Sequence, residues 1–457
     1  MGPAHQMMAA DHSALLMDGV VALYLELLEN GVRYFLPDSH LQVAGPDPEG
    51  SLDFELSLRH DGSLQLSWFG QRYVLRRAVG AFGMEEIRLL SAVGATLRAR
   101  YELLRSPGAA AGGMKLLRGI PEDRVVSAYL DPELYEDPGR AAAGDRVADA
   151  LETLRVISLS TYENRRISTG VLLVGADPDA SHPEVPAPDR ALRFDAALTA
   201  IKSFARLSDG VDTLLLVDRQ GKLVDLTDVR DWSRPYADLS LPAPAGGVYR
   251  DHCLATVRGG HICLVLTPNG EIKVFAGGAQ LFNYLGGRWR LTESEEKYVA
   301  WRQAIGDPRL AEILFTASLN LTEKRKGGLF VVVETPEDGD AILQPRDRLR
   351  KEAPVTDSVD KTQIHYLLRG KTVFELPPNV LETIASMDGA ILLDRQGQLL
   401  SFGAILQHDR DSFSPAVRVE GGRTTAAVSA SRAGLVLKIS EDGIVSFFRA
   451  GRQVWEM

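Results

Sequence analysis

The sequence predicts an α/β protein in which two tandem mixed-sheet α/β domains follow a small α+β module. The main evidence is an internal repeat, because the segment Leu214–Leu223 recurs as Ile391–Leu399 around a shared Asp-Arg-Gln-Gly turn. Helical and apolar strand patterns flank both copies in the same order, and such self-similarity is the signature of a duplication. Alternation of helices and strands within each copy favours a mixed sheet covered by helices.

The composition is that of an ordinary folded protein. The chain has 457 residues, of which 45% are hydrophobic and 25% are charged, as is typical of globular domains. Its 51 basic and 61 acidic side chains give a net charge of −10, which disfavours non-specific binding to nucleic acid or to an anionic membrane. We therefore expect no nucleic-acid partner and no membrane partner.

Cysteine usage and the lack of targeting patterns predict a cytoplasmic protein. The two cysteines, Cys253 and Cys263, are too few for a disulfide framework, so a reducing compartment fits best. Residues Met1–Gln6 show no signal-peptide pattern, and no run of 18 apolar residues occurs.

Residues 1–118 form the predicted α+β module, which we interpret as a sensor domain. Its hydrophobic periodicity predicts two amphipathic helices around three strands, with a hairpin turn at Arg59–Gly62. In chain order these elements are Ala14–Glu29, Leu52–Leu58, Ser63–Trp68, Gln71–Arg76 and Met84–Leu104. The Gly- and Ala-rich run Ser106–Gly113 marks a linker after the module.

The two repeat copies occupy residues 119–290 and 291–457. Their border lies near Thr292–Glu296, where a threonine before acidic residues resembles a helix start. Each copy opens with a helical pattern before an apolar strand: Val147–Arg166 before Gly170–Val174, and Leu310–Lys326 before Gly328–Val333.

The second copy carries the pattern that we single out as a candidate site. Asp388-Gly389-Ala390 leads into an apolar strand, and Gly422-Arg423-Thr424-Thr425 opens a predicted helix before the strand Leu435–Ser440. Backbone N–H groups, hydroxyls and a guanidinium bind phosphate, and a carboxylate at a strand end can hold a cation. Taken alone, the first segment is more often a simple turn, and the second is more often a capped helix start.

The order of these motifs resembles the diadenylate cyclase domain, the DisA-type nucleotide-binding fold, over about residues 300–450. That family condenses two ATP molecules into cyclic di-AMP with a divalent metal, and two domains face each other to do so. The resemblance implies a site for ATP or cyclic di-AMP with Mg²⁺ or Mn²⁺. It also implies pairing of the domains, as an intrachain pseudo-dimer of the two copies or as a homodimer.

The resemblance also assigns roles to residues. Asp388 would be the catalytic residue that faces the metal and the attacking hydroxyl. The nucleotide-binding positions would be Gly389, Ala390, Gly422, Arg423, Thr424, Thr425 and Ser440. These residue types suit phosphoryl transfer, which depends on metal and cationic groups more than on covalent catalysis.

One departure from the family bears on activity. Thr424 and Thr425 stand where the family has His and Arg, so hydroxyls replace two cation-capable contacts to the triphosphate. Losing one strong electrostatic contact costs about 10²–10³ in rate. We therefore expect binding to survive on Arg423, the backbone and the metal, whereas fast turnover is in question.

The first copy departs further. Asp212 falls opposite Asp388, but alignment of the strands Leu264–Leu266 and Leu435–Leu437 places His252-Cys253-Leu254 opposite Arg423-Thr424-Thr425. No arginine is then expected at that position, and the first copy is interpreted as a structural or allosteric partner. The sequence leaves three functions open: a cyclase controlled by the N-terminal regions, an inactive adenine-nucleotide sensor, and a scaffold for protein contacts.

Overall fold

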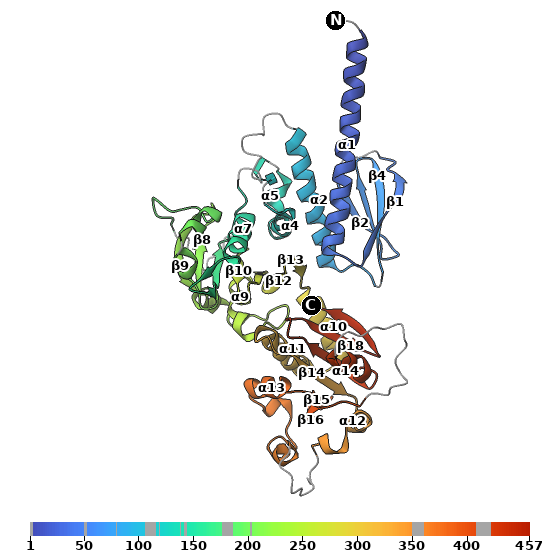
Figure 1. Cartoon of the computed structure of the whole chain (residues 1–457), viewed down its shortest axis with the longest axis vertical. Coiled ribbons are helices and arrows are strands. Elements are labelled where there is room, and N and C mark those ends of the chain that lie inside the picture. Colours follow the sequence, from blue (N-terminus) through green and yellow to red (C-terminus); the bar gives the residue numbers. More distant parts are fainter. Residues whose placement is uncertain are drawn as a thin grey trace. The chain divides into compact units, whose positions relative to one another are not determined.

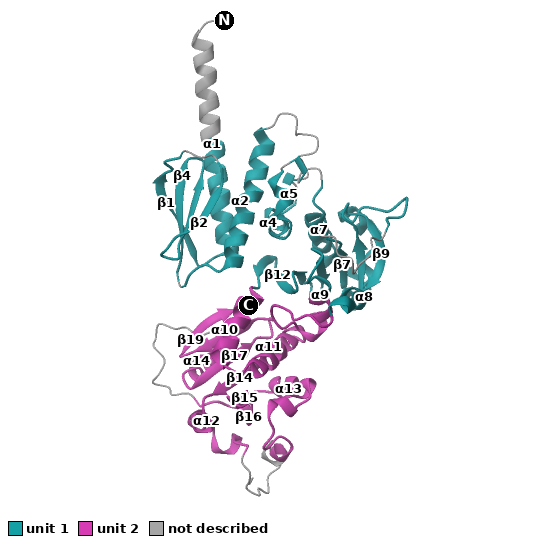
Figure 2. Ribbon diagram, turned by 180° about the vertical axis from the view of Figure 1, so that it is seen from behind, with its two compact units in different colours: residues 1–236, 255–292 teal, residues 237–254, 293–457 magenta. Residues whose placement is uncertain are grey.

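The computed structural model describes residues 3–49, 53–78, 80–105, 116–117, 119–137, 139–140, 144–175, 186–201, 203–349, 361–407 and 422–457. By their contacts these residues form two compact units (Figure 2). The first unit contains residues 1–236 and 255–292, and the second contains residues 237–254 and 293–457. The predicted linker Ser106–Gly113 lies outside the described residues.

The N-terminal part of the first unit is a four-stranded antiparallel sheet with two long helices (Figure 1). The predicted hairpin is confirmed, since β2 (Glu55–Leu58) pairs with β3 (Leu64–Trp68), and β3 pairs with β4 (Gln71–Arg77). The sequence did not predict β1 (Ser39–Pro46), which pairs with β4 at the sheet edge. The helices are α1 (Pro3–Phe35), longer than predicted, and α2 (Met84–Arg105).

The rest of the first unit is built on a seven-stranded mixed sheet in the order β13-β12-β11-β10-β7-β8-β9. Its strands are β7 (Thr169–Leu173), β8 (Thr213–Val217), β9 (Leu223–Asp228), β10 (Ile262–Leu266), β11 (Ile272–Ala276), β12 (Ala279–Leu285) and β13 (Arg288–Leu291). The helices are α4 (Pro121–Leu130), α5 (Pro132–Glu136), α7 (Arg146–Ser158) and α8 (Val229–Ser233). One hydrophobic core continues from Tyr24 in the N-terminal part to Trp289 in β13, so both parts of this unit share a core.

One predicted helix in this region is too long. Instead of running over Val147–Arg166, α7 ends at Ser158. The following residues form a two-stranded hairpin, β5 (Thr161–Tyr162) and β6 (Arg165–Arg166). The turn residues Glu163 and Asn164 have φ angles of +50° and +61°, and this left-handed backbone cannot continue a right-handed helix.

The second unit has a six-stranded mixed sheet in the order β16-β15-β14-β17-β18-β19. Its strands are β14 (Gly328–Val333), β15 (Ala390–Asp394), β16 (Leu399–Ala404), β17 (Gly434–Ile439), β18 (Val445–Arg449) and β19 (Arg452–Glu456). Its helices are α10 (Ser294–Ile305), α11 (Pro308–Glu323), α12 (Pro336–Ile342), α13 (Pro378–Ala385) and α14 (Gly422–Ala430). One core packs α10, α11 and α13 on the sheet, and a second core packs α12 and α14 on it.

The two mixed sheets share a topology, which confirms the predicted α/β class. In each sheet a single parallel pair, β7–β8 or β14–β15, stands beside antiparallel neighbours. The order β11-β10-β7-β8-β9 in the first sheet corresponds to β18-β17-β14-β15-β16 in the second. The predicted domain borders remain predictions, and residues 237–254 from within the first copy belong by contact to the second unit.

Strand registers correct the alignment between the copies. Leu266 pairs with Thr169 and with Ile272, whereas Ile439 pairs with Gly328 and with Val445. Leu266 therefore corresponds to Ile439, two residues away from the sequence-based alignment. Counting back without gaps, Arg250-Asp251-His252 replaces His252-Cys253-Leu254 opposite Arg423-Thr424-Thr425. In this ungapped alignment Arg250 stands opposite Arg423. The expectation that the first copy has no arginine opposite Arg423 is therefore wrong for this alignment.

Candidate functional site

The predicted site residues converge on one end of the second unit's sheet. Gly328 of β14 pairs with Ile439 of β17, so the next residues outward, Gly327 and Ser440, lie opposite each other. The parallel register of β14 with β15 likewise extends to place Asp388 beside Gly327. Three segments far apart in sequence thus lie at the same end of the neighbouring strands β15, β14 and β17.

Arg423, in the first turn of α14, reaches this end of the sheet. Its Nη1 atom would lie 2.1 Å from a Cβ atom added to Gly327, so the guanidinium occupies the space that the missing side chain leaves. The same Nη1 donates to Oε1 of Glu441 at 2.8 Å. The guanidinium is about one-third exposed and Glu441 about two-thirds exposed, so this ion pair is accessible to a competing anion.

Sequence reasoning missed a second cation. Lys438 of β17 donates from Nζ to Oγ1 of Thr424 at 3.2 Å. Side chains alternate along a strand, and Val436, two residues away, belongs to the core beneath α14. Lys438 therefore stands on the α14 face and brings a positive charge to Thr424. Only the strand register and the helix position reveal this, because the two residues are 14 apart in sequence.

Asp388 lies in the bend before β15 and its side chain is exposed. No hydrogen bond or ion pair joins its carboxylate to another residue in the described part of the chain. Among the described residues, no cluster of three or more His, Cys, Asp or Glu side chains is placed to hold a metal. A divalent ion at Asp388 would thus need most of its ligands from the phosphates of a nucleotide and from water, as Mg²⁺ commonly does.

The fold itself explains several of the other predicted positions. Gly389 has a φ of +105°, and a Cβ there would lie 2.5 Å from the backbone of Gly403, so β16 alone requires this glycine. Ala390 is fully buried in β15 and offers only its backbone. The hydroxyl of Ser440 accepts from the N–H of Ile444 at 3.2 Å, which stabilises the β17–β18 turn.

The remaining positions are less constrained. Gly422 begins α14, is exposed, and has no atom within 4 Å of an added Cβ. Thr425 is half-buried in the first turn of the same helix. Residues 408–421, which separate β16 from α14 in the chain, lie outside the described residues.

The corresponding place in the first copy has different chemistry. Ser168 takes the position of Gly327 in the shared register, so a side chain begins where the second copy leaves room for Arg423. Asp212, opposite Asp388, is ion-paired with Arg230. Thr267 takes the place of Ser440 and accepts from the N–H of Glu271 at 3.2 Å, the same turn contact. The first copy has thus kept the turn and lost the glycine beside the strand.

Similarity of this chain to known proteins is found among solved structures. No protein-family model matches the chain, and no curated protein matches it. A hypothetical membrane spanning protein from Bacillus cereus matches 34% of this chain and 69% of its own at 24% identity, with a TM-score of 0.25. A double-cysteine mutant of DacA from Staphylococcus aureus matches 35% of this chain and 87% of its own at 18% identity, with a TM-score of 0.19. Within the described residues of the present chain, no helix has the length and hydrophobicity to span a bilayer.

Proposed function

We propose that the second unit binds a metal-bound adenine nucleotide at the sheet end formed by β14, β15 and β17. The observation that carries the proposal is the position of Arg423, whose guanidinium reaches Gly327 from α14. The β14–β15 register, extended beyond its last pair, sets Asp388 at the same end of the sheet. Lys438 adds a second cation at the first turn of α14. Two cations and an unpaired carboxylate are the groups that a triphosphate with a divalent ion requires.

The activity that fits the sequence resemblance is condensation of two ATP molecules into cyclic di-AMP. In that reaction each 3′-hydroxyl attacks the α-phosphate of the other nucleotide, and pyrophosphate leaves from each. Mg²⁺ or Mn²⁺ would supply charge neutralisation on the phosphates. Asp388 would hold the ion and orient the hydroxyl, while Arg423 and Lys438 would bind phosphate oxygens. Lys438 offsets part of the charge that Thr424 and Thr425 remove.

The second candidate function is a non-catalytic sensor of ATP or cyclic di-AMP. One observation favours it: in the first copy Ser168 replaces Gly327, and Asp212 there is already ion-paired. An intrachain pair of the two copies would therefore contain one competent site. Catalysis by two facing sites would then require second units from two chains, that is, a homodimer.

The test is incubation of the full chain with ATP and Mg²⁺ or Mn²⁺, with mass spectrometry for cyclic di-AMP and thermal denaturation in parallel. Product that disappears in Asp388→Asn but persists in the neighbouring surface variant Asp442→Asn supports the cyclase. A shift of the melting temperature by ATP or cyclic di-AMP without product supports the sensor, since a ligand that binds only the folded state raises stability. If neither product nor thermal shift is seen, the cyclase and the sensor are both contradicted, and the scaffold function is left. Unchanged Mg-ATP affinity in Asp388→Asn would show that the site assignment is wrong.

A further inference from the structure

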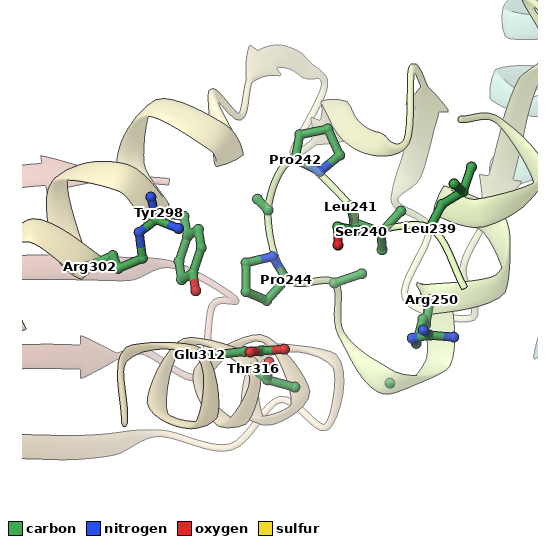
Figure 3. Close-up of a pocket in the computed structure, with 13 residues that line it drawn as sticks. Leu239, Ser240, Leu241, Pro242, Pro244, Arg250, Tyr298, Arg302, Glu312 and Thr316 are labelled. Carbon is green, nitrogen blue, oxygen red and sulfur yellow. The ribbon is translucent and has the colours of Figure 1, made fainter. Parts of the chain in front are cut away.

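The second unit contains a cavity of about 500 Å³ that the proposed nucleotide site does not use (Figure 3). Its walls are the crossover segment Leu239–Gly247 and parts of α10 and α11. Glu312 and Thr316, on α11, line it. Because α11 continues to Glu323 before the chain turns back into β14, Thr316 lies about 10 Å along the helix from the end nearest the nucleotide site.

The crossover segment forms a fixed apolar wall. Pro242 and Pro244 carry no N–H group, and Ala243 between them is buried in the core with Tyr298 and Trp301. The segment is also bonded to α11, because the N–H of Gly247 donates to Oδ1 of Asn320 at 2.7 Å. The wall is therefore largely preformed, as small-molecule sites usually are.

Charges of both signs face the cavity. Arg250, Arg302 and Glu312 line it, and none of their charged groups forms an ion pair or hydrogen bond with another described residue. The Arg302 guanidinium lies 5.8 Å from the centre of the Tyr298 ring. Burial raises the pKa of Tyr298, the charge of Glu312 raises it further, and the charge of Arg302 lowers it. Figure 3 shows the Tyr298 side chain beside Pro244 and the Glu312 carboxylate below this proline.

We propose that this cavity binds a free α-amino acid with an apolar side chain. A zwitterion complements walls that present an unpaired cation and an unpaired anion across an apolar surface. Arg250 or Arg302 would bind the carboxylate, Glu312 would accept from the ammonium group, and the side chain would pack on the prolines and on Tyr298. A simple anion would leave Glu312 unpaired beside a negative charge, and a simple cation would do the same to the arginines.

The location gives the site a regulatory character. The chain leaves the first unit after Tyr236 and returns to it at Ala255, and the crossover segment lies between these two points. A ligand between this segment and the helices α10 and α11 would therefore restrain the stretch of chain that connects the first unit to the second. This inference is independent of the nucleotide proposal, because the two sites share no residue.

The test uses the full chain in isothermal titration calorimetry and thermal denaturation with L-leucine and L-phenylalanine. Each amino acid is compared with its methyl ester, which lacks the carboxylate, and with its N-acetyl derivative, which lacks the ammonium charge. We expect binding of at least one free amino acid and at least tenfold weaker binding of both derivatives. Glu312→Gln should weaken binding about tenfold or more, and so should the double substitution Arg250→Gln with Arg302→Gln. Glu295→Gln, an exposed change on α10 outside the cavity, should not.

The derivatives make the outcome decisive even if a variant folds poorly. Equal binding of the N-acetyl derivative and the free amino acid would overturn the role of Glu312 and make the site one for simple anions. No heat and no thermal shift with any of the probes at 10 mM would mean that the cavity holds only water. The ATP-induced thermal shift should be the same in Glu312→Gln as in the unmodified chain, which separates this site from the nucleotide site.

Discussion

Arg423 and Glu441 form an ion pair of 2.8 Å at the sheet end where the nucleotide site is proposed. Both side chains are partly exposed, and exposed pairs of this kind contribute only about 0–1 kcal/mol to stability. The Glu441 carboxylate therefore contributes little to the stability of the fold, and its main effect is to occupy a hydrogen-bond donor of Arg423. A phosphate that binds Nη1 of Arg423 therefore competes with Glu441.

The first prediction follows from this competition. Glu441→Gln should raise the affinity for Mg-ATP several-fold, because the neutral amide competes less with phosphate for Arg423. The melting temperature without nucleotide should stay nearly unchanged. Titration calorimetry measures the affinity, and Asp442→Asn, which removes the adjacent exposed charge, is the matched control. Equal effects of the two substitutions would show a general charge effect and not the release of Arg423.

The second prediction concerns the space under Arg423. In Gly327→Ala the new methyl group would lie 2.1 Å from Nη1, so the guanidinium must move. Because the end of a long side chain moves easily, we expect little loss of stability and about a tenfold loss of Mg-ATP affinity. Gly19→Ala, whose added Cβ meets no atom within 4 Å, controls for the substitution itself. Retention of full affinity in Gly327→Ala would separate Arg423 from nucleotide binding.

The third prediction distinguishes a structural glycine from a binding one. Gly389→Ala would place a Cβ 2.5 Å from the backbone of Gly403 at a φ of +105°. Neither this backbone contact nor the strained φ angle can be relieved by moving a side chain. We expect a loss of about 1–3 kcal/mol or more in the free energy of unfolding, measured by urea denaturation. Gly422→Ala, with open space around its Cβ, should change that free energy by less than about 1 kcal/mol. Equal stabilities would show that the β15–β16 contact does not impose the glycine.

Local signals in the sequence were sufficient for much of the fold. The start of α11 combines Asp307, whose side chain accepts from the N–H of Leu310, with Pro308 in the first turn, and both are sequence-level start signals. The repeat correctly indicated two sheets of one topology. By contrast, β1 depends on pairing with β4, from which β2 and β3 separate it in the chain, and its Gly and Pro residues weaken the strand pattern.

The alignment error between the copies has a physical cause. Strands β10 and β17 are apolar along most of their length, and a two-residue slip keeps every side chain on the same face of the sheet. Hydrophobic pattern alone therefore cannot choose between the two alignments. Pairing partners choose between them, and an ungapped count from these partners aligns Arg250 with Arg423 in sequence. The same non-local information places Lys438 beside Thr424.

The last prediction concerns the buried polar network of the first unit. Asp145 accepts from Nη1 of Arg124 at 3.0 Å, from Ser127 Oγ at 2.7 Å and from Tyr135 Oη at 2.5 Å, and it also caps α7. Burial, and next the charge of Asp145, hold the pKa of Tyr135 well above its ordinary value. The folded protein therefore keeps a phenol proton that the unfolded chain releases above about pH 10.

The free energy of unfolding should consequently fall as the pH rises above about 10, and the slope should be smaller in Tyr135→Phe, which has no proton to lose. At pH 8 the same variant should be less stable by about 1.5–3 kcal/mol, since it lacks the hydrogen bond to a charged partner. Urea denaturation at pH 8 and at pH 10.5 measures both quantities. Tyr366→Phe, which changes a tyrosine that is 68% exposed, should reproduce the slope of the unmodified chain. If Tyr135→Phe has that slope as well, the buried phenol is not the group that links stability to high pH.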